Sequence, residues 1–213
     1  MKEREEKAQF WALNAASLLG QLTISMVNLA LVYYLRYTLE ASAAVVGAAA
    51  STYTSVYLIC CLALGGFYQR FRPYKVVTVS VLGMALSSFL VTRTSSIILV
   101  FSFLILYGFF MSMLWPQVEA WITRGAEGSR LNRLTSAFNF SWSFGTGISP
   151  YVTAFLVTYS PSAALAGAVV LFVVIALVFQ LLAASCPSVR ALVPEREYIR
   201  TKEKNEEKSD HSA

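Results

Sequence analysis

Residues 97 to 118 read IILVFSFLILYGFFMSMLWPQV and contain no charged side chain. A hydrocarbon core about 30 Å thick is crossed by a helix of roughly 20 apolar residues, so this run predicts a membrane-spanning helix. The rest of the chain has the same character, since 56% of its 213 residues are hydrophobic and only 14% are charged. This composition excludes a water-soluble globular domain and predicts an integral membrane protein.

Five further uncharged runs of comparable length accompany this one, separated by short polar connections. We predict transmembrane helices at about residues 10–35, 42–67, 76–92, 97–122, 135–158 and 163–186. The expected fold class is an all-α polytopic membrane protein with six transmembrane helices. Its expected parts are a cytoplasmic N-terminus (1–9), a transmembrane bundle (10–186) and a charged cytoplasmic tail (187–213).

The basic residues predict the orientation of this bundle. All 17 Lys and Arg residues except Arg36 and Arg93 lie at the two termini or in the connections on one side of the predicted spans. The positive-inside rule therefore places both termini in the cytoplasm and the chain in a cytoplasmic (inner or plasma) membrane. The net charge of +5 is thus a topology signal, and no nucleic-acid partner is expected.

Few residues are suited to catalysis or metal binding. Cys60, Cys61 and Cys186 lie in or at the ends of apolar runs, and the single histidine is His211 in the polar tail. Three cysteines supply neither a disulfide framework nor a four-ligand metal site. The spans hold no histidine and no paired carboxylates for general acid or base work. We therefore expect no enzyme, no metal and no cofactor.

The first predicted span carries a polar stripe. Its members recur every three or four residues, which puts them on one face of a helix: Asn14, Ser17, Gln21, Ser25 and Asn28. Such side chains in a membrane either line a solute pathway or form hydrogen bonds that hold helices together. The fifth span carries a second polar face, which includes Asn139 and Trp142. Our candidates for a solute path are Asn14, Gln21, Asn28, Asn139 and Trp142.

Two spans carry small residues at every fourth position, the pattern by which membrane helices approach closely. The second span has Gly47, Ser51 and Ser55, and the fifth has Gly145, Ser149 and Thr153. We expect both rows to be packing faces.

Glu119 is the single acidic residue inside a predicted span. An ionised carboxylate at mid-bilayer costs several kcal/mol. We therefore expect Glu119 to lie at the interface or to pair with a cytoplasmic arginine such as Arg70, while coupling to protons or cations is the alternative.

Three segments resemble motifs of the major facilitator superfamily. Residues 65–75 read GGFYQRFRPYK and resemble the family's loop of Gly, three residues, Asp, Arg, one residue, Gly and then basic residues. Gly65 and Arg70 match this loop. Gln69 stands where the family has Asp, and Arg72 stands where it has the second Gly.

The other two segments lie in the fifth and fourth predicted spans. Residues 139–150 read NFSWSFGTGISP and resemble the family's Asn-x-Ser-Trp-x-x-Gly-x-x-x-Gly-Pro. The stretch from Gly108 through Pro116 to Glu119 is similar to the family's small-residue helix that ends in Pro and an acidic residue near the cytoplasm. All three segments occur in the spans where the family has them.

This resemblance implies two inverted three-helix repeats, with solute bound near the membrane midplane by spans one, two, four and five. It implies alternating access by the rocking of two six-helix halves, with Gln69, Arg70 and Glu119 as gating or ion-pair residues. The expected function is a membrane transporter, or half of one, moving a small organic solute that is neutral and forms hydrogen bonds. The alternative is a non-transporting membrane assembly partner or sensor.

The chain holds the spans of one half alone. We expect a truncated gene product, a separately encoded half or a half that pairs with itself. The expected partners are therefore the lipid bilayer, a small-molecule solute, and a second six-helix half or a second copy of the chain.

Overall fold

The computed structural model describes residues 2–187, 189, 192, 194, 197 and 199–201, with the backbone alone for residues 2–6. Most of the predicted charged tail therefore lies outside the described residues. The described part of the chain consists of helices and short connections and contains no strand. Its elements are α1 (Lys2–Tyr33), the π-helical turn η1 (Tyr34–Thr38), α2 (Ala43–Tyr68), α3 (Pro73–Val91), α4 (Ile97–Thr123), α5 (Gly128–Val157) and α6 (Pro161–Ser185). The predicted all-α class is confirmed.

Five helical segments in the described ranges are long and apolar enough to cross a membrane: Lys7–Thr38, Ala43–Tyr68, Pro73–Val91, Ile97–Thr123 and Pro161–Ser185. Helix α5 is not among them. Polar residues such as Asn132, Asn139 and Ser143 lower its hydropathy, although at Gly128–Val157 it is also long enough to span. The count of six spans stays a prediction.

Several helix ends follow from local side-chain chemistry. The Ser42 hydroxyl accepts a hydrogen bond from the Val45 N–H (3.4 Å), and the Ser160 hydroxyl accepts one from the Ala163 N–H (3.0 Å). Each serine thereby caps the first turn of the helix that follows it. Pro161 occupies the first turn of α6, where its missing N–H costs nothing.

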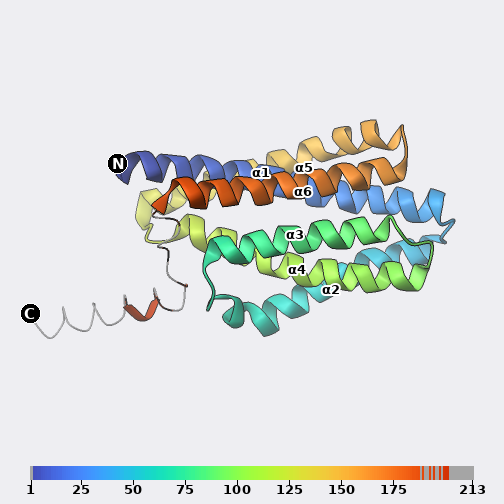
Figure 1. The fold of residues 1–213 in the computed structure, drawn as a ribbon, viewed down its shortest axis with the longest axis horizontal. Coiled ribbons are helices and arrows are strands. Elements are labelled where there is room, and N and C mark those ends of the chain that lie inside the picture. Colours follow the sequence, from blue (N-terminus) through green and yellow to red (C-terminus); the bar gives the residue numbers. More distant parts are fainter. Residues whose placement is uncertain are drawn as a thin grey trace, which may run out of the picture.

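The helices form two groups of three (Figure 1). In one group α1 packs against α5 and α6, and in the other α4 packs against α2 and α3. The two groups meet most extensively where α3 lies against α6. We call this contact the α3–α6 seam.

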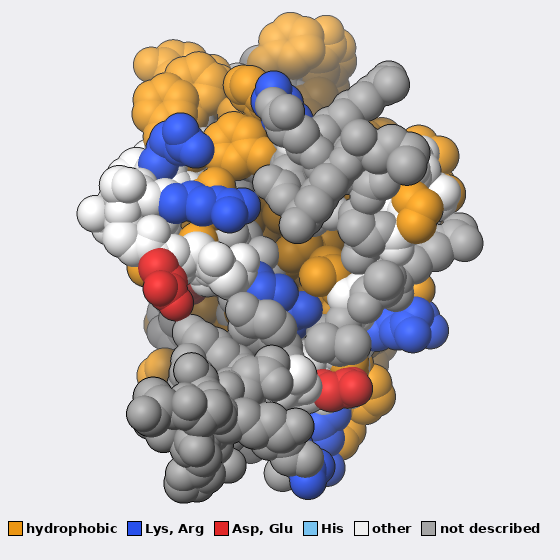
Figure 2. All heavy atoms as spheres, turned by 90° about the vertical axis from the view of Figure 1, so that its left-hand side faces the viewer, with side chains coloured by type: hydrophobic (Ala, Val, Ile, Leu, Met, Phe, Trp, Pro, Cys, Tyr) orange, Lys and Arg blue, Asp and Glu red, His pale blue; other side chains and the backbone are white. Residues whose placement is uncertain are grey.

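The N-terminus and the end of α6 lie at the same end of the bundle (Figure 1). The connections from α2 to α3 and from α4 to α5 lie at this end as well. Figure 2 shows Lys and Arg side chains spread across it. The connections and ends that hold the basic residues are thus gathered on one end of the molecule.

The closed core of the bundle lies between the two groups and beside the seam. Phe172 of α6 is fully buried, and its ring centroid lies 6.4 Å from that of Tyr107 of α4. Gln180 of α6 donates a hydrogen bond to the Thr78 hydroxyl of α3 (3.0 Å). Aromatic packing and an interhelical hydrogen bond thus join the groups on this side.

The predicted packing row of the fifth span is confirmed. Gly145, Ser149 and Thr153 are the buried residues of α5. A Cβ atom at Gly145 would lie 2.3 Å from the Leu18 carbonyl oxygen of α1. The absence of a side chain at Gly145 therefore lets the two backbones approach closely.

The predicted packing row of the second span does not pack inside the bundle of described residues. Gly47, Ser51 and Ser55 are exposed, and α2 instead packs through a different face that includes Ala49 and Tyr53. Tyr53 meets α4 at Gly108, where an added Cβ atom would lie 2.4 Å from the Tyr53 carbonyl oxygen. The small residue at this contact is Gly108 of α4, so α2 needs no small residue of its own there.

Pro116 explains one contact between α2 and α4. A proline has no N–H, so Pro116 leaves the carbonyl of Ser112, four residues earlier, without its helical partner. The Cys61 thiol of α2 donates to this carbonyl oxygen (3.7 Å). Cys61 therefore satisfies a backbone group that the proline releases.

Candidate functional site

A cavity of about 400 Å³ opens between the two helix groups, with walls that come from α1, α2, α4 and α5. Its lining residues are Gln21, Ile24 and Asn28 of α1, Tyr53, Thr54 and Tyr57 of α2, Met111, Trp115 and Glu119 of α4, and Phe138 and Trp142 of α5. We call this space the central cavity. None of its lining residues comes from the two helices of the seam, α3 and α6.

Two amides from the predicted stripe reach the central cavity. The Gln21 Nε2 donates to the Ser25 hydroxyl one turn further along α1 (3.2 Å). The Asn28 Oδ1 is buried and has no hydrogen-bond partner. A buried acceptor without a partner costs about 1–3 kcal/mol. Asn28 therefore offers a hydrogen-bond site that the protein itself leaves unfilled.

Aromatic side chains form much of the cavity wall. The rings of Trp115 and Phe138 meet edge to face with their centroids 6.1 Å apart, which joins α4 to α5. The Trp142 side chain is 39% exposed, and Tyr57 contributes a further ring from α2. An aromatic wall of this kind offers flat apolar surfaces and ring faces that carry partial negative charge.

Glu119 brings a carboxylate to the central cavity, and its side chain is exposed. Among the described residues, no ion pair joins Glu119 to Arg70. The Arg70 guanidinium instead lies 5.9 Å from the centroid of the Phe67 ring. Gln69 ends α2, and its N–H bonds to the Gly65 carbonyl (3.4 Å). Of the three predicted gating residues, the structure thus places Glu119 alone in the cavity.

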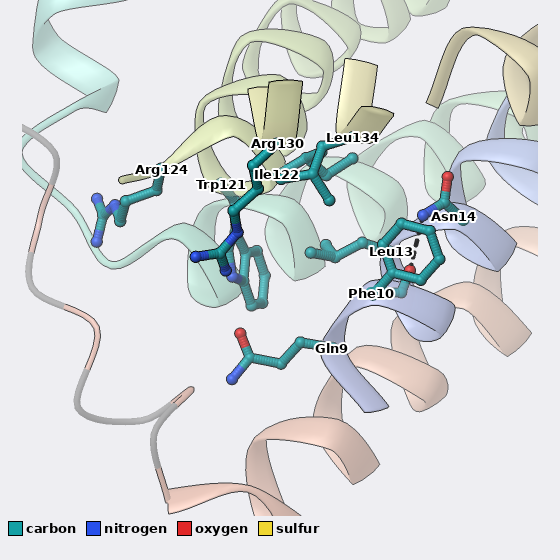
Figure 3. Close-up of a pocket in the computed structure, with 9 residues that line it drawn as sticks. All are labelled: Gln9, Phe10, Leu13, Asn14, Trp121, Ile122, Arg124, Arg130 and Leu134. Atoms are coloured by element: carbon teal, nitrogen blue, oxygen red, sulfur yellow. Dashed lines mark hydrogen bonds between the residues drawn. The ribbon is translucent and has the colours of Figure 1, made fainter. Parts of the chain in front are cut away.

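Asn14 lies apart from the central cavity. It lines a smaller pocket of about 110 Å³ between the start of α1, the end of α4 and the start of α5 (Figure 3). Its Nδ2 donates to the Phe10 carbonyl (2.8 Å), and its Oδ1 accepts from the Ser141 hydroxyl of α5 (3.3 Å). These contacts are those of a residue that holds α1 to α5.

The remaining candidate, Asn139, is exposed on α5 and does not line the central cavity. Of the five predicted path residues, the structure therefore brings Gln21, Asn28 and Trp142 together. The two alternatives for the α1 stripe were hydrogen bonding between helices and lining a pathway, and each fits one part of the stripe. Asn14 joins helices, while Gln21 and Asn28 face the cavity.

Sequence reasoning missed most of the aromatic wall. The signal was present, because cavity residues recur every four positions on three helices: Tyr53 and Tyr57; Met111, Trp115 and Glu119; Phe138 and Trp142. This spacing marks one helix face. A search for polar stripes alone overlooks such a face when its members are aromatic.

The chain matches a protein-family model. The family model of the Major Facilitator Superfamily matches residues 13–209, which include α1 from residue 13 onward and the whole of α2 to α6. Among curated proteins, no sequence matches the chain.

Proposed function

Since the chain belongs to the Major Facilitator Superfamily, we propose that it transports a small organic solute by alternating access through the central cavity. The proposal includes six spans, with α5 as the fifth, in a cytoplasmic membrane with both termini in the cytoplasm. The gathering of the basic connections at one end of the bundle supports this orientation (Figure 2).

The helix contacts support an arrangement of two three-helix repeats. If the repeats are α1–α3 and α4–α6, then α1 corresponds to α4, α2 to α5 and α3 to α6. The α1–α5 contact then corresponds to the α4–α2 contact, and the α3–α4 contact to the α6–α1 contact. The α3–α6 contact corresponds to itself. Helices α1 and α4 run in opposite directions along the bundle (Figure 1), as inverted repeats require.

The observation that carries the proposal is the cavity itself. It lies between the two groups, is lined by α1, α2, α4 and α5, and contains Gln21 and the unpartnered Asn28 acceptor. Polar groups inside spans that do not bond to neighbouring helices are typical of solute pathways.

The experiment compares two amide substitutions of the full chain in proteoliposomes. Gln21→Leu removes an amide from the cavity, whereas Gln180→Leu removes one that bonds Thr78 at the α3–α6 seam. Uptake is screened first with wild-type protein against a panel of small organic solutes. We expect Gln21→Leu to abolish uptake and Gln180→Leu to retain it, with equal insertion of both variants. Unchanged uptake by Gln21→Leu would contradict the assignment of the cavity.

We propose further that a second six-helix unit, either another chain or a second copy, completes the cavity. The exposed Gly47, Ser51 and Ser55 row on α2 supports this, because small residues permit close helix approach. Native mass spectrometry of the chain in nanodiscs tests it, and a strictly monomeric chain that transports would contradict it.

A further inference from the structure

The electrostatic character of the central cavity indicates the charge of its solute. Glu119 contributes a carboxylate, and none of the lining residues is Lys, Arg or His. A cavity whose one ionisable acid has no basic counterpart among its lining residues attracts cations and repels anions.

The hydrogen-bonding groups of the cavity also fit a cationic solute. The Asn28 Oδ1 is a buried acceptor without a partner, and the Glu119 carboxylate adds acceptor oxygens. The Gln21 Nε2 gives one of its two N–H groups to Ser25. The cavity therefore favours a solute that brings N–H or O–H donors.

The aromatic wall supplies the third feature. Trp115, Phe138, Trp142 and Tyr57 line the same space as Glu119. Ring faces attract organic cations, and a tryptophan face does so most strongly. The same rings bind the apolar body of a solute.

From these three features we infer that the central cavity binds an organic cation, a protonated amine with an apolar or aromatic body. The charged nitrogen faces the Glu119 carboxylate and the aromatic rings, and a donor on the solute fills the vacant Asn28 Oδ1 acceptor. This inference rests on the proposed function and replaces the neutral solute that the amides alone suggested.

Three probes that share a benzyl body test the charge preference. Benzylammonium is the cation, benzyl alcohol is the neutral probe and phenylmethanesulfonate is the anion. Binding to the purified full chain is followed by the change in tryptophan fluorescence, because Trp115 and Trp142 both line the cavity. We expect saturable binding of the cation at least about tenfold tighter than that of the other two probes, the lower limit for a bond to a charged group.

Matched substitutions test which side chains produce the preference for the cation. Glu119→Gln keeps the size of the side chain and removes its charge, so we expect cation affinity to fall by about tenfold or more. Glu40→Gln makes the same change at an exposed residue outside the cavity and leaves affinity unchanged. Trp142→Phe retains binding, whereas Trp142→Leu weakens it, since leucine fills space without a ring face.

The outcomes separate this inference from the proposed function. If the neutral or anionic probe binds as tightly as the cation, or if Glu119→Gln binds the cation like wild type, the cationic class is overturned and the cavity still binds solute. If none of the three probes binds, the cationic class is overturned as well, and the solute screen with Gln21→Leu then decides the proposed function by itself.

Discussion

The two helix groups meet on two sides that differ in almost every physical respect. At the α3–α6 seam, Gln180 bonds Thr78 across the groups, and the neighbouring core around Phe172 is fully buried. On the other side, the groups enclose about 400 Å³ and leave the Asn28 acceptor unpartnered. One side holds the groups together, and the other leaves open the cavity that we propose receives a solute. Amides occur on both sides, so a polar residue in a span can either join helices or line the cavity.

The largest expected contrast concerns aromatic truncation on the two sides. Phe172→Ala removes a fully buried ring and is expected to lower the free energy of unfolding by about 3 kcal/mol. Trp142→Ala removes a ring that is 39% exposed at the cavity and is expected to cost less than half as much. Reversible unfolding of both variants in mild detergent measures the difference. Equal losses would show that the cavity wall is packed like the core.

A smaller effect is expected where α5 rests on α1 and thereby fixes one wall of the cavity. Gly145→Ala places a methyl group against the Leu18 carbonyl, so we expect a destabilisation of about 1–3 kcal/mol. Gly147, half a turn away, has open space around it. Gly147→Ala is therefore expected to leave the unfolding temperature unchanged or slightly raised. A Gly145→Ala variant as stable as wild type would mean that this helix contact is loose.

Much of this architecture follows from the sequence, because apolar runs and basic connections obey simple physical rules. The helical class and the packing row at Gly145 were predicted in this way. The row at Gly47 does not pack inside the bundle, for a physical reason. Spacing identifies a face of α2 but says nothing about which face meets α4, and the small residue at that contact, Gly108, belongs to α4.

The candidate site was predictable only in part, because spacing along one helix does not show which helices meet. Gln21, Asn28 and Trp142 were found because polar or indole groups are unusual in a span. Asn14 belongs to the same stripe, yet its position beside Ser141 of α5 depends on how α1 and α5 cross, which spacing does not reveal. The role of Glu119 likewise depends on the aromatic rings that other helices place around it.

The most direct test of a solute path through the central cavity uses two positions on the α1 stripe in a chain whose native cysteines are replaced by serine. Asn28→Cys lies at the central cavity, whereas Ser17→Cys lies at a position that is 1% exposed. Both variants in proteoliposomes are treated with a membrane-impermeant maleimide. If the cavity is a solute path, Asn28→Cys is labelled at least about tenfold faster than Ser17→Cys, because the accessible thiolate reacts. Equal labelling rates, or no labelling of Asn28→Cys, would contradict a solute path through the central cavity.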